Sequence, residues 1–260
     1  GQYPRIVGET GGKDFIFAHA SADVPALVTA LVRGAFEYQG QKCSAASRAF
    51  IPESLWKDVK ARLLAEVATI TMGDVGDFTN FMGAVIDRSA YAGIKGYIDR
   101  ARKARGKAKI IAGGGCDDSQ GYFIEPTVIE CADPAYESMV EEIFGPVLSV
   151  HVYPDNELAK ILKVVDTASA YALTGAVFAQ DRKAIVKIKD ALEGTAGNFY
   201  INDKPTGAVV GQQPFGGSRA SGTNDKAGSA INLLRWLTPR TVKETFNPPR
   251  DYRYPFMEAK

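Results

Sequence analysis

Apolar residues recur every three or four positions in several segments of the chain, which is the spacing of one helix face. The first of these segments begins after Asp23, a helix-capping residue type, and ends at Gly40. Its apolar face carries Leu27, Leu31 and Phe36. The same spacing predicts further helices over residues 53–70, 88–105, 157–165 and 182–192.

Short runs rich in β-branched and aromatic residues separate these helical segments and are typical of strands. They lie at residues 4–7, 14–17, 48–51, 108–112, 123–129, 147–152, 174–178 and 198–201. Because helices and strands alternate, the pattern predicts an α/β fold with a largely parallel, twisted sheet flanked by helices.

Two later segments differ from this alternation. Residues 204–228 form a long loop rich in Gly, Pro, Ser and Asn, and loops of this length inside a domain usually carry function. Residues 233–246 indicate an edge strand or a strand exchanged with another subunit. The triple glycine at 113–115 supplies no third glycine at the spacing of a dinucleotide-binding fingerprint, so we expect no such fold within the chain.

Composition narrows the function classes. The chain has 260 residues, 45% of them hydrophobic, which is enough for a full core. A formal net charge of +1 indicates no nucleic-acid partner, and no apolar run approaches the ~20 residues of a membrane span. The start, Gly-Gln-Tyr-Pro-Arg, is unlike a signal peptide and lacks an initiator Met, so we expect a piece of a longer protein.

Three cysteines, at positions 43, 116 and 131, form an odd set without CxxC spacing. This predicts neither a disulfide framework nor a metal site, and it indicates a reducing compartment. We expect Cys116 and Cys131 to be small buried hydrophobes. Cys43 differs, because Gln41, Lys42 and Ser44 surround it and it follows a glycine turn.

Cys43 is the candidate nucleophile. A thiol reacts as the thiolate, and backbone N–H groups at a junction between elements can favour that form. With only His19 and His151 in the chain, a Cys–His hydrolase is an alternative. His151 alternates with valines, however, which suits a strand residue better than a general base.

Two further motifs carry carboxylates. Glu9 lies in the loop Gly-Glu-Thr-Gly-Gly-Lys at 8–13, where glycines allow a sharp turn toward another loop; a solvated turn glutamate is the other interpretation. In the run Glu-Glu-Ile-Phe-Gly-Pro at 141–146, the acids could hydrogen-bond a sugar diol and the phenylalanine could pack on a flat ring. They could equally be exposed acids beside a core phenylalanine, and the spacing leaves both open.

Taken together, these motifs resemble the aldehyde dehydrogenase superfamily, from Pro4 to about Phe246. The loop at 8–13 resembles the family's general-base loop, although leucine is common where Thr10 stands. Residues 40–43 resemble the nucleophile loop, and 141–147 the cofactor-contact motif. Residues 202–226, with 235–236 and 243–246, resemble the Δ1-pyrroline-5-carboxylate dehydrogenase branch, also called L-glutamate γ-semialdehyde dehydrogenase, which completes the oxidation of proline to glutamate.

The resemblance implies a domain plan. Residues 1–235 would be the catalytic domain and residues 236–260 a C-terminal oligomerisation strand and tail. An N-terminal domain that binds most of the NAD, and an asparagine that helps hold the oxyanion, would lie outside this chain. The resemblance also implies a homodimer or higher homo-oligomer, in a bacterial cytoplasm or, in a eukaryote, the mitochondrial matrix.

The resemblance also assigns roles. Cys43 would attack the aldehyde to give a thiohemiacetal, hydride transfer to NAD would leave a thioester, and Glu9 would activate the water that releases the acid. The cofactor-binding residues would be Glu142, for the nicotinamide ribose, and Phe144, near the ring. The substrate's α-carboxylate and aliphatic part would meet Ser44, Gly207, Ala208 and Phe215.

Two other functions stay open for the chain by itself. We expect it to be inactive as a dehydrogenase alone, so it could be an inert folding and assembly domain. A chain that retains Cys43 and Glu9 could also be a residual thiol esterase.

Overall fold

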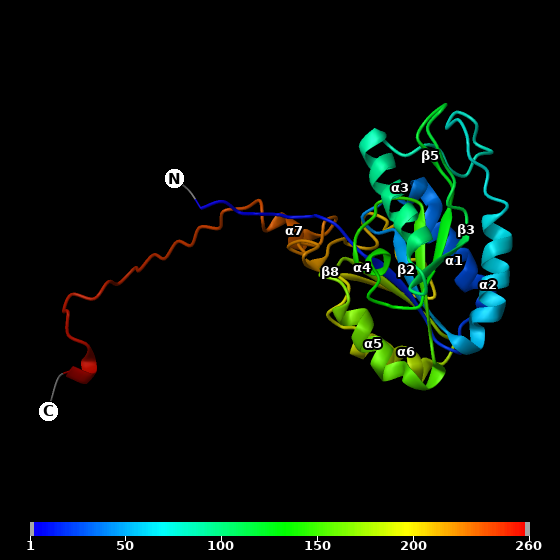
Figure 1. The fold of residues 1–260 in the computed structure, drawn as a ribbon. Coiled ribbons are helices and arrows are strands. Elements are labelled where there is room, and N and C mark those ends of the chain that lie inside the picture. Colours follow the sequence, from blue (N-terminus) through cyan, green and yellow to red (C-terminus); the bar gives the residue numbers. More distant parts are fainter. Residues whose placement is uncertain (1–2, 258–260) are drawn as a thin grey trace.

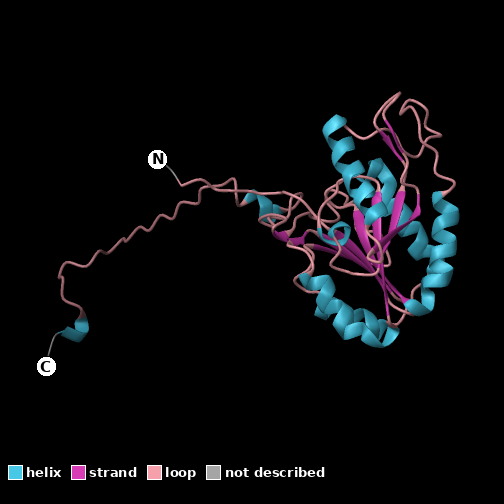
Figure 2. Ribbon diagram, in the orientation of Figure 1, coloured by secondary structure: helices cyan, strands magenta, loops and turns pink. Residues whose placement is uncertain are grey.

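A seven-stranded sheet runs through the body of the molecule in the computed structural model, which describes residues 3–257 (Figures 1 and 2). The strand order is β10-β9-β1-β2-β7-β6-β3, and every neighbouring pair is parallel except β6 and β3. The predicted α/β fold with a largely parallel sheet is therefore confirmed. The strands are β1 (Asp14–Ala18), β2 (Ala46–Pro52), β3 (Ala108–Ala112), β6 (Thr127–Cys131), β7 (Val147–Tyr153), β9 (Thr174–Phe178) and β10 (Asn198–Ile201).

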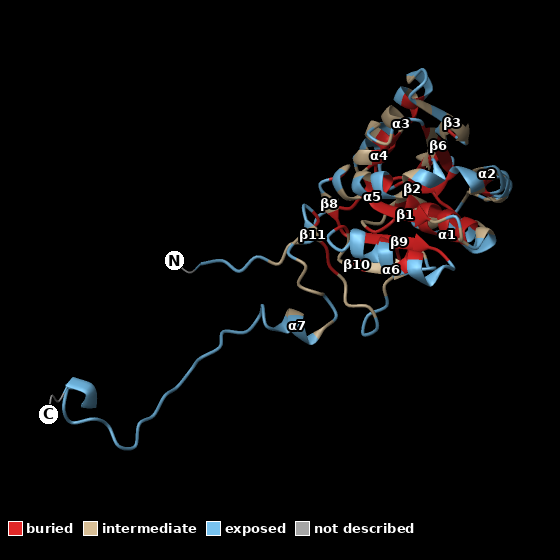
Figure 3. Cartoon of the chain, turned by 90° about the horizontal axis from the view of Figure 1, so that it is seen from below, coloured by how far each residue is buried: buried red, intermediate tan, exposed pale blue. Residues whose placement is uncertain are grey.

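Helices cover both faces of the sheet, and each face has its own apolar core. Because side chains alternate along a strand, β1 directs Phe15 and Phe17 into one core and Ile16 and Ala18 into the other. The buried residues follow the strands through the middle of the body (Figure 3). One core is closed by α1 (Val24–Phe36) and α2 (Glu53–Val67), and the other by α3 (Arg88–Lys103), α5 (Leu158–Thr167) and α6 (Arg182–Ala191).

Two predicted boundaries are wrong for local backbone reasons. The helix that Asp23 caps ends at Phe36 rather than at Gly40, because the next residues form the tight turn η1 (Glu37–Gly40) with left-handed backbone. The strand expected over 123–129 divides into β5 (Phe123–Ile124) and β6 around Pro126, whose nitrogen has no hydrogen to donate to a ladder.

The remaining elements are short. They are β4 (Cys116–Asp117), paired with β5; β8 (Tyr171–Ala172), paired with β11 (Ser218–Arg219); α4 (Glu137–Val140); η2 (Asp155–Glu157); α7 (Ala230–Leu233); and η3 (Pro255–Met257).

The strand predicted at residues 4–7 does not form. Ile6 is exposed, and these residues run beside the start of the C-terminal segment, where Arg5 donates a hydrogen bond to the carbonyl of Arg235 at 3.4 Å. An apolar run makes a strand only where a neighbouring strand supplies the ladder, and here the first backbone bridge is at Glu9, with Gly222.

Beyond α7 the chain leaves the body as an exposed extended segment that ends in η3 (Figures 1 and 3). Between residues 234 and 257 no strand forms within the chain. The predicted tail at 236–260 concerns pairing with another subunit and stays a prediction; its last three residues lie outside the described range. Among the helices of residues 3–257, none has the length and apolar character needed to cross a bilayer.

Candidate active site

Three loops meet at the amino ends of neighbouring strands. Cys43 precedes β2, the glutamate loop at 9–13 precedes β1, and residues 142–146 precede β7. Because β1, β2 and β7 are parallel and adjacent in the sheet, the loops that enter them must lie side by side. Sheet order thus brings together three motifs that are far apart in the sequence.

Glycine allows the closest of these approaches. The Gly12 backbone N–H donates to Glu142 Oε1 at 2.9 Å. A Cβ on Gly12 would lie 2.3 Å from the Cys43 carbonyl oxygen and 2.4 Å from Asp14 Oδ2, far inside van der Waals contact. Residue 12 must therefore be glycine for the loop to pass between Glu142 and Cys43.

Cys43 is half-buried in the turn between η1 and β2, where the Ala45 N–H donates to the Lys42 carbonyl at 3.1 Å. Burial raises the pKa of the thiol, and the nearby carboxylates of Asp14, Glu9 and Glu142 raise it further. A backbone N–H lowers the pKa but does not outweigh them. The expected preference for thiolate is thus absent at rest, and the thiol must lose its proton to react.

Glu9 lies on the exposed side of its loop. The loop is fastened to residues 221–223, with the Thr10 N–H donating to the Ser221 carbonyl at 3.2 Å and the Thr223 N–H donating to the Gly8 carbonyl at 3.0 Å. Partial burial raises the pKa of Glu9, while Lys226 opposes that shift. A carboxylate with a raised pKa is the stronger base.

A cavity of about 700 Å³ opens beside Cys43. Six residues that the sequence analysis singled out line it, together with Thr10, Lys42 and Thr206: Cys43, Ser44, Phe144, Gly207, Ala208 and Phe215. Glu142 lines a smaller hollow that also contains Cys43 and Phe144. Glu9 lines neither, although its neighbour Thr10 lines the large cavity.

The loop after β10 supplies another part of the cavity wall. The buried Ser44 hydroxyl lies 2.8 Å from the Thr206 hydroxyl, which joins this loop to the residue after Cys43. Gly207 has φ +89°, a left-handed conformation that glycine adopts without strain. Backbone N–H groups in such turns can form a concave site for an anion.

The side chains of Glu142 and Phe144 are suited to contact a nicotinamide nucleotide. Glu142 Oε1 accepts the Gly12 N–H, and its side chain stays partly exposed. Phe144 has left-handed backbone, with φ 56°, and its side chain is 45% exposed beside Cys43. A carboxylate acceptor next to a presented aromatic ring suits a ribose diol and a flat ring.

A buried charged cluster behind the site was missed from the sequence. Lys13, Asp14 and Arg48 are each at most 2% exposed. Asp14 Oδ1 accepts the Thr174 N–H at 2.6 Å, and Arg48 Nε donates to the Lys13 carbonyl at 2.9 Å. Burial lowers the pKa of Lys13 to about 7, with Arg48 adding to the effect, and raises the pKa of Asp14 to about 8. The sequence did contain a sign of this cluster. Lys13 and Asp14 directly follow the two glycines at 11–12, and Arg48 begins a predicted strand.

The histidines do not complete a Cys–His pair in the cavity. His151 Nδ1 lies 3.0 Å from the Cys131 carbonyl, and His19 Nδ1 lies 2.9 Å from Ser21 Oγ. Neither histidine lines the cavity beside Cys43.

Cys131 is buried as predicted, whereas Cys116 is only half-buried because it lies in the short β4–β5 hairpin. Within residues 3–257 no His, Cys, Asp and Glu side chains gather as a metal site would require.

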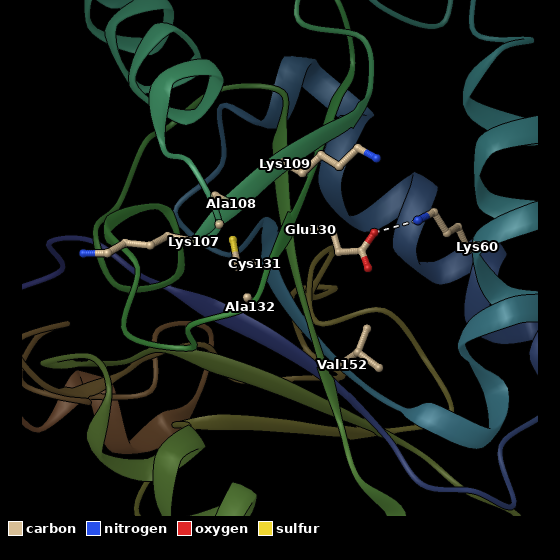
Figure 4. A pocket seen from close by; sticks show the side chains of 9 residues that line it. Lys60, Lys107, Ala108, Lys109, Glu130, Cys131, Ala132 and Val152 are labelled. Atoms are coloured by element: carbon tan, nitrogen blue, oxygen red, sulfur yellow. Dashed lines mark hydrogen bonds and ion pairs between the residues drawn. The ribbon is translucent and has the colours of Figure 1, made fainter.

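A second cavity, of about 520 Å³, lies beside the edge strand β3 and does not include Cys43 (Figure 4). Lys60 Nζ and Glu130 Oε2 form an ion pair of 2.6 Å across it. Lys107 points away from this pair. The second cavity is thus separate from the converging loops.

Curated relatives match nearly the whole chain. Mitochondrial Δ1-pyrroline-5-carboxylate dehydrogenase of Dictyostelium discoideum is 59% identical over 255 residues, which is 98% of this chain and 46% of the relative. The human protein of the same name is 52% identical over 257 residues, again 46% of its length. The chain therefore spans about half the length of the curated relatives it matches.

Solved structures give the same picture. The Δ-pyrroline-5-carboxylate dehydrogenase from Mycobacterium tuberculosis, bound with NAD and cobalamin, is 57% identical with a TM-score of 0.90, covering 99% of this chain and 47% of that one. A Thermus 1-pyrroline-5-carboxylate dehydrogenase with bound NAD is 35% identical with a TM-score of 0.80, covering 88% and 43%. The sequence profile of the aldehyde dehydrogenase family matches residues 1–242. This chain belongs to the aldehyde dehydrogenase family.

Proposed function

We propose that the chain is the catalytic domain of an NAD-dependent dehydrogenase that oxidises L-glutamate γ-semialdehyde, the open form of Δ1-pyrroline-5-carboxylate, to L-glutamate in proline degradation. The observation that carries this proposal is one cavity lined both by a cysteine and by a glycine-containing loop suited to a carboxylate. A substrate with an aldehyde at one end and a carboxylate at the other matches that pair. The names of the relatives support the same substrate.

The aldehyde end would react at Cys43. The sulfur attacks the carbonyl carbon once the thiol has lost its proton, and the carbonyl oxygen takes the negative charge. The backbone N–H of Cys43 is one donor for this oxyanion, and such a donor contributes about 3 kcal/mol in acyl-transfer enzymes. NAD, when bound, would supply the hydride acceptor, and loss of the hydride would leave an acyl thioester on Cys43.

Glu9 would act in the second half of the reaction. Its raised pKa suits it to accept a proton from the water that attacks the thioester. The products of that step are the γ-carboxyl group of glutamate and the free thiol. Glu142 and Phe144 would orient the nicotinamide ribose and ring during hydride transfer.

The carboxylate end would bind opposite the sulfur. The backbone of Gly207 and Ala208 and the Ser44 hydroxyl would hold the α-carboxylate, and Phe215 would pack on the aliphatic chain. All of these residues line the same cavity.

Other parts of the proposal concern the whole protein. Most of the NAD would be bound outside this chain, because no dinucleotide fingerprint occurs in it. The protein would be a homodimer or higher homo-oligomer, in a bacterial cytoplasm or, for a eukaryotic source, in the mitochondrial matrix. The names of two relatives support the organelle, since both proteins are called mitochondrial. A thiol esterase is the second candidate, favoured by Cys43 and Glu9 being present together without a nucleotide domain.

The test compares cysteine variants in a protein that carries this chain and spans the full length of its relatives. Cys43→Ser should lower NADH formation from glutamate semialdehyde more than about a thousandfold. Cys116→Ser, at a half-buried thiol outside the cavity, is the matched control and should keep its rate. Unchanged turnover in Cys43→Ser would remove this residue from the mechanism. In the 260-residue chain, Cys43-dependent hydrolysis of an activated ester would support the esterase.

A further inference from the structure

A shared carboxylate links the nucleophile loop to the loop that carries Gly207. Glu37, the first residue of η1, accepts hydrogen bonds at Oε2 from Lys42 Nζ at 3.0 Å and from Lys204 Nζ at 3.2 Å. Lys42 directly precedes Cys43, and Lys204 begins the loop that carries Gly207. One carboxylate oxygen therefore holds two loops that are more than 160 residues apart.

The Lys204 ammonium group also contacts the turn predicted to bind the substrate carboxylate. Lys204 Nζ also donates to the Thr206 carbonyl at 3.3 Å. The position of a Cβ on Gly207 would lie 3.0 Å from that same Nζ. The ammonium group thus lies against the turn, and a displaced Lys204 would change the backbone of Thr206 and Gly207.

The ion pair between Lys42 and Glu37 spans a strained turn that leads to Cys43. Tyr38 and Gln39 both have φ 58°, an uncommon left-handed conformation for residues other than glycine, and Gly40 continues it with φ 64°. Left-handed residues in a row persist only where contacts impose them. Glu37 and Lys42 lie at the two ends of this turn, and their ion pair fixes the distance between those ends.

The three charged side chains are shielded rather than exposed. Each is between 23% and 28% exposed, so water screens these pairs less than it screens a surface pair. Lys42 Nζ also lies 5.8 Å from the centre of the Tyr38 ring, within the range of a cation–π contact. Two ion pairs and a cation–π contact therefore hold Glu37, Lys42 and Lys204 in place.

We propose that Glu37 is a positioning residue that couples the carboxylate-binding loop to the nucleophile loop, so that a bound substrate carboxylate and the sulfur of Cys43 keep a fixed separation. This inference rests on the proposed function, because it takes the Gly207–Ala208 turn as the carboxylate site. It predicts that the two ends of the cavity respond together when Glu37 is changed.

The test uses the 260-residue chain and measures alkylation of Cys43 by iodoacetamide, followed at the Cys43 peptide by mass spectrometry. L-Glutamate, the proposed product, is the probe and should slow alkylation by filling the cavity. In Glu37→Gln we expect the half-protecting concentration of L-glutamate to rise about tenfold, since charge-assisted contacts on both loops are lost. Glu193→Gln, which neutralises an exposed carboxylate beyond α6, should leave that concentration unchanged.

A double-mutant cycle separates coupling from general loosening. Lys204→Met removes the ion pair with Glu37 together with the hydrogen bond to the Thr206 carbonyl, and it should raise the half-protecting concentration by itself. If Glu37 acts through Lys204, the double variant should lose little more than Lys204→Met alone. Independent, additive losses would overturn the proposed route through Glu37.

The remaining outcomes also decide the question. Equal protection of Glu37→Gln and the unchanged chain would overturn the inference and leave the proposed function standing. No protection of the unchanged chain by L-glutamate would instead overturn the carboxylate site, and the coupling with it. Circular dichroism identifies a variant that does not fold; if Glu37→Gln is such a variant, unaltered protection in Lys204→Met would overturn the coupling.

Discussion

The acidity of Cys43 is set by its immediate neighbours. Burial and three carboxylates raise the pKa of its thiol, and one of those carboxylates belongs to Glu9. Both groups have pKa values above their ordinary ranges, because burial disfavours the charged form of each. These effects favour the neutral thiol over the thiolate.

The first prediction follows from the sign of this interaction. Glu9→Gln removes a negative charge near the sulfur, so the thiolate becomes easier to form and the pKa of Cys43 falls. The pH midpoint of iodoacetamide alkylation should move downward, while Glu193→Gln should leave the midpoint in place. A midpoint that moves upward would mean that Glu9 takes the thiol proton rather than repelling the thiolate.

Among single residues, those that line the cavity could be predicted from sequence motifs, whereas the buried charged residues could not. Cys43, Ser44 and Phe144 were named from short motifs, and all three line one cavity. Lys13 and Arg48 were missed, because burial of a charged side chain depends on neighbours that come from distant strands. Glu37 was missed for the same reason, since its two partners lie on separate loops.

At the scale of elements, the site depends on the order of strands. The sheet places β1 and β7 on either side of β2, so three entry loops meet at one edge. Apolar patterns predicted these strands, but they carry no information about which strands become neighbours. The run at 4–7 has the same pattern and forms no strand, because it finds no partner. Local composition thus predicts the capacity to pair, and the fold decides where pairing occurs.

The second prediction tests the closest contact between those loops. Gly12→Ala would place a methyl group 2.3 Å from the Cys43 carbonyl oxygen, so the backbone must shift. We expect a loss of about 1–3 kcal/mol in the free energy of unfolding and a changed rate of Cys43 alkylation. Both are measurable, by urea denaturation and by labelling.

The matched control for Gly12→Ala is another glycine with open space. Gly93 lies within α3, and apart from the adjoining backbone of the helix no heavy atom lies within 4 Å of the place where its Cβ would be. Gly93→Ala should raise the free energy of unfolding by about 0.5–1 kcal/mol, because alanine favours the helix. A Gly12→Ala variant as stable as the unchanged chain would contradict the close approach that the structure describes.

At the scale of the whole molecule, the folded body and the C-terminal segment differ in how much apolar surface they bury. The two cores are complete within the body, whereas the segment from 234 to 257 buries none of its large apolar side chains. These exposed residues include Leu234, Trp236, Leu237, Val242, Phe246, Tyr252, Tyr254, Phe256 and Met257. Apolar surface of this extent is typical of segments that are covered by another molecule.

The third prediction is that removal of residues 238–260 separates stability from self-association. The free energy of unfolding should change by less than about 0.5 kcal/mol, because side chains this exposed contribute little to the folded state. Sedimentation velocity should show association of the intact chain and its loss after truncation. Phe246→Asp with Tyr254→Asp, in the intact chain, should also abolish association, because each places a charge on a surface that must be desolvated. A truncated chain that still associates would locate the contact on the body, and one that unfolds more easily would show that the segment packs against it.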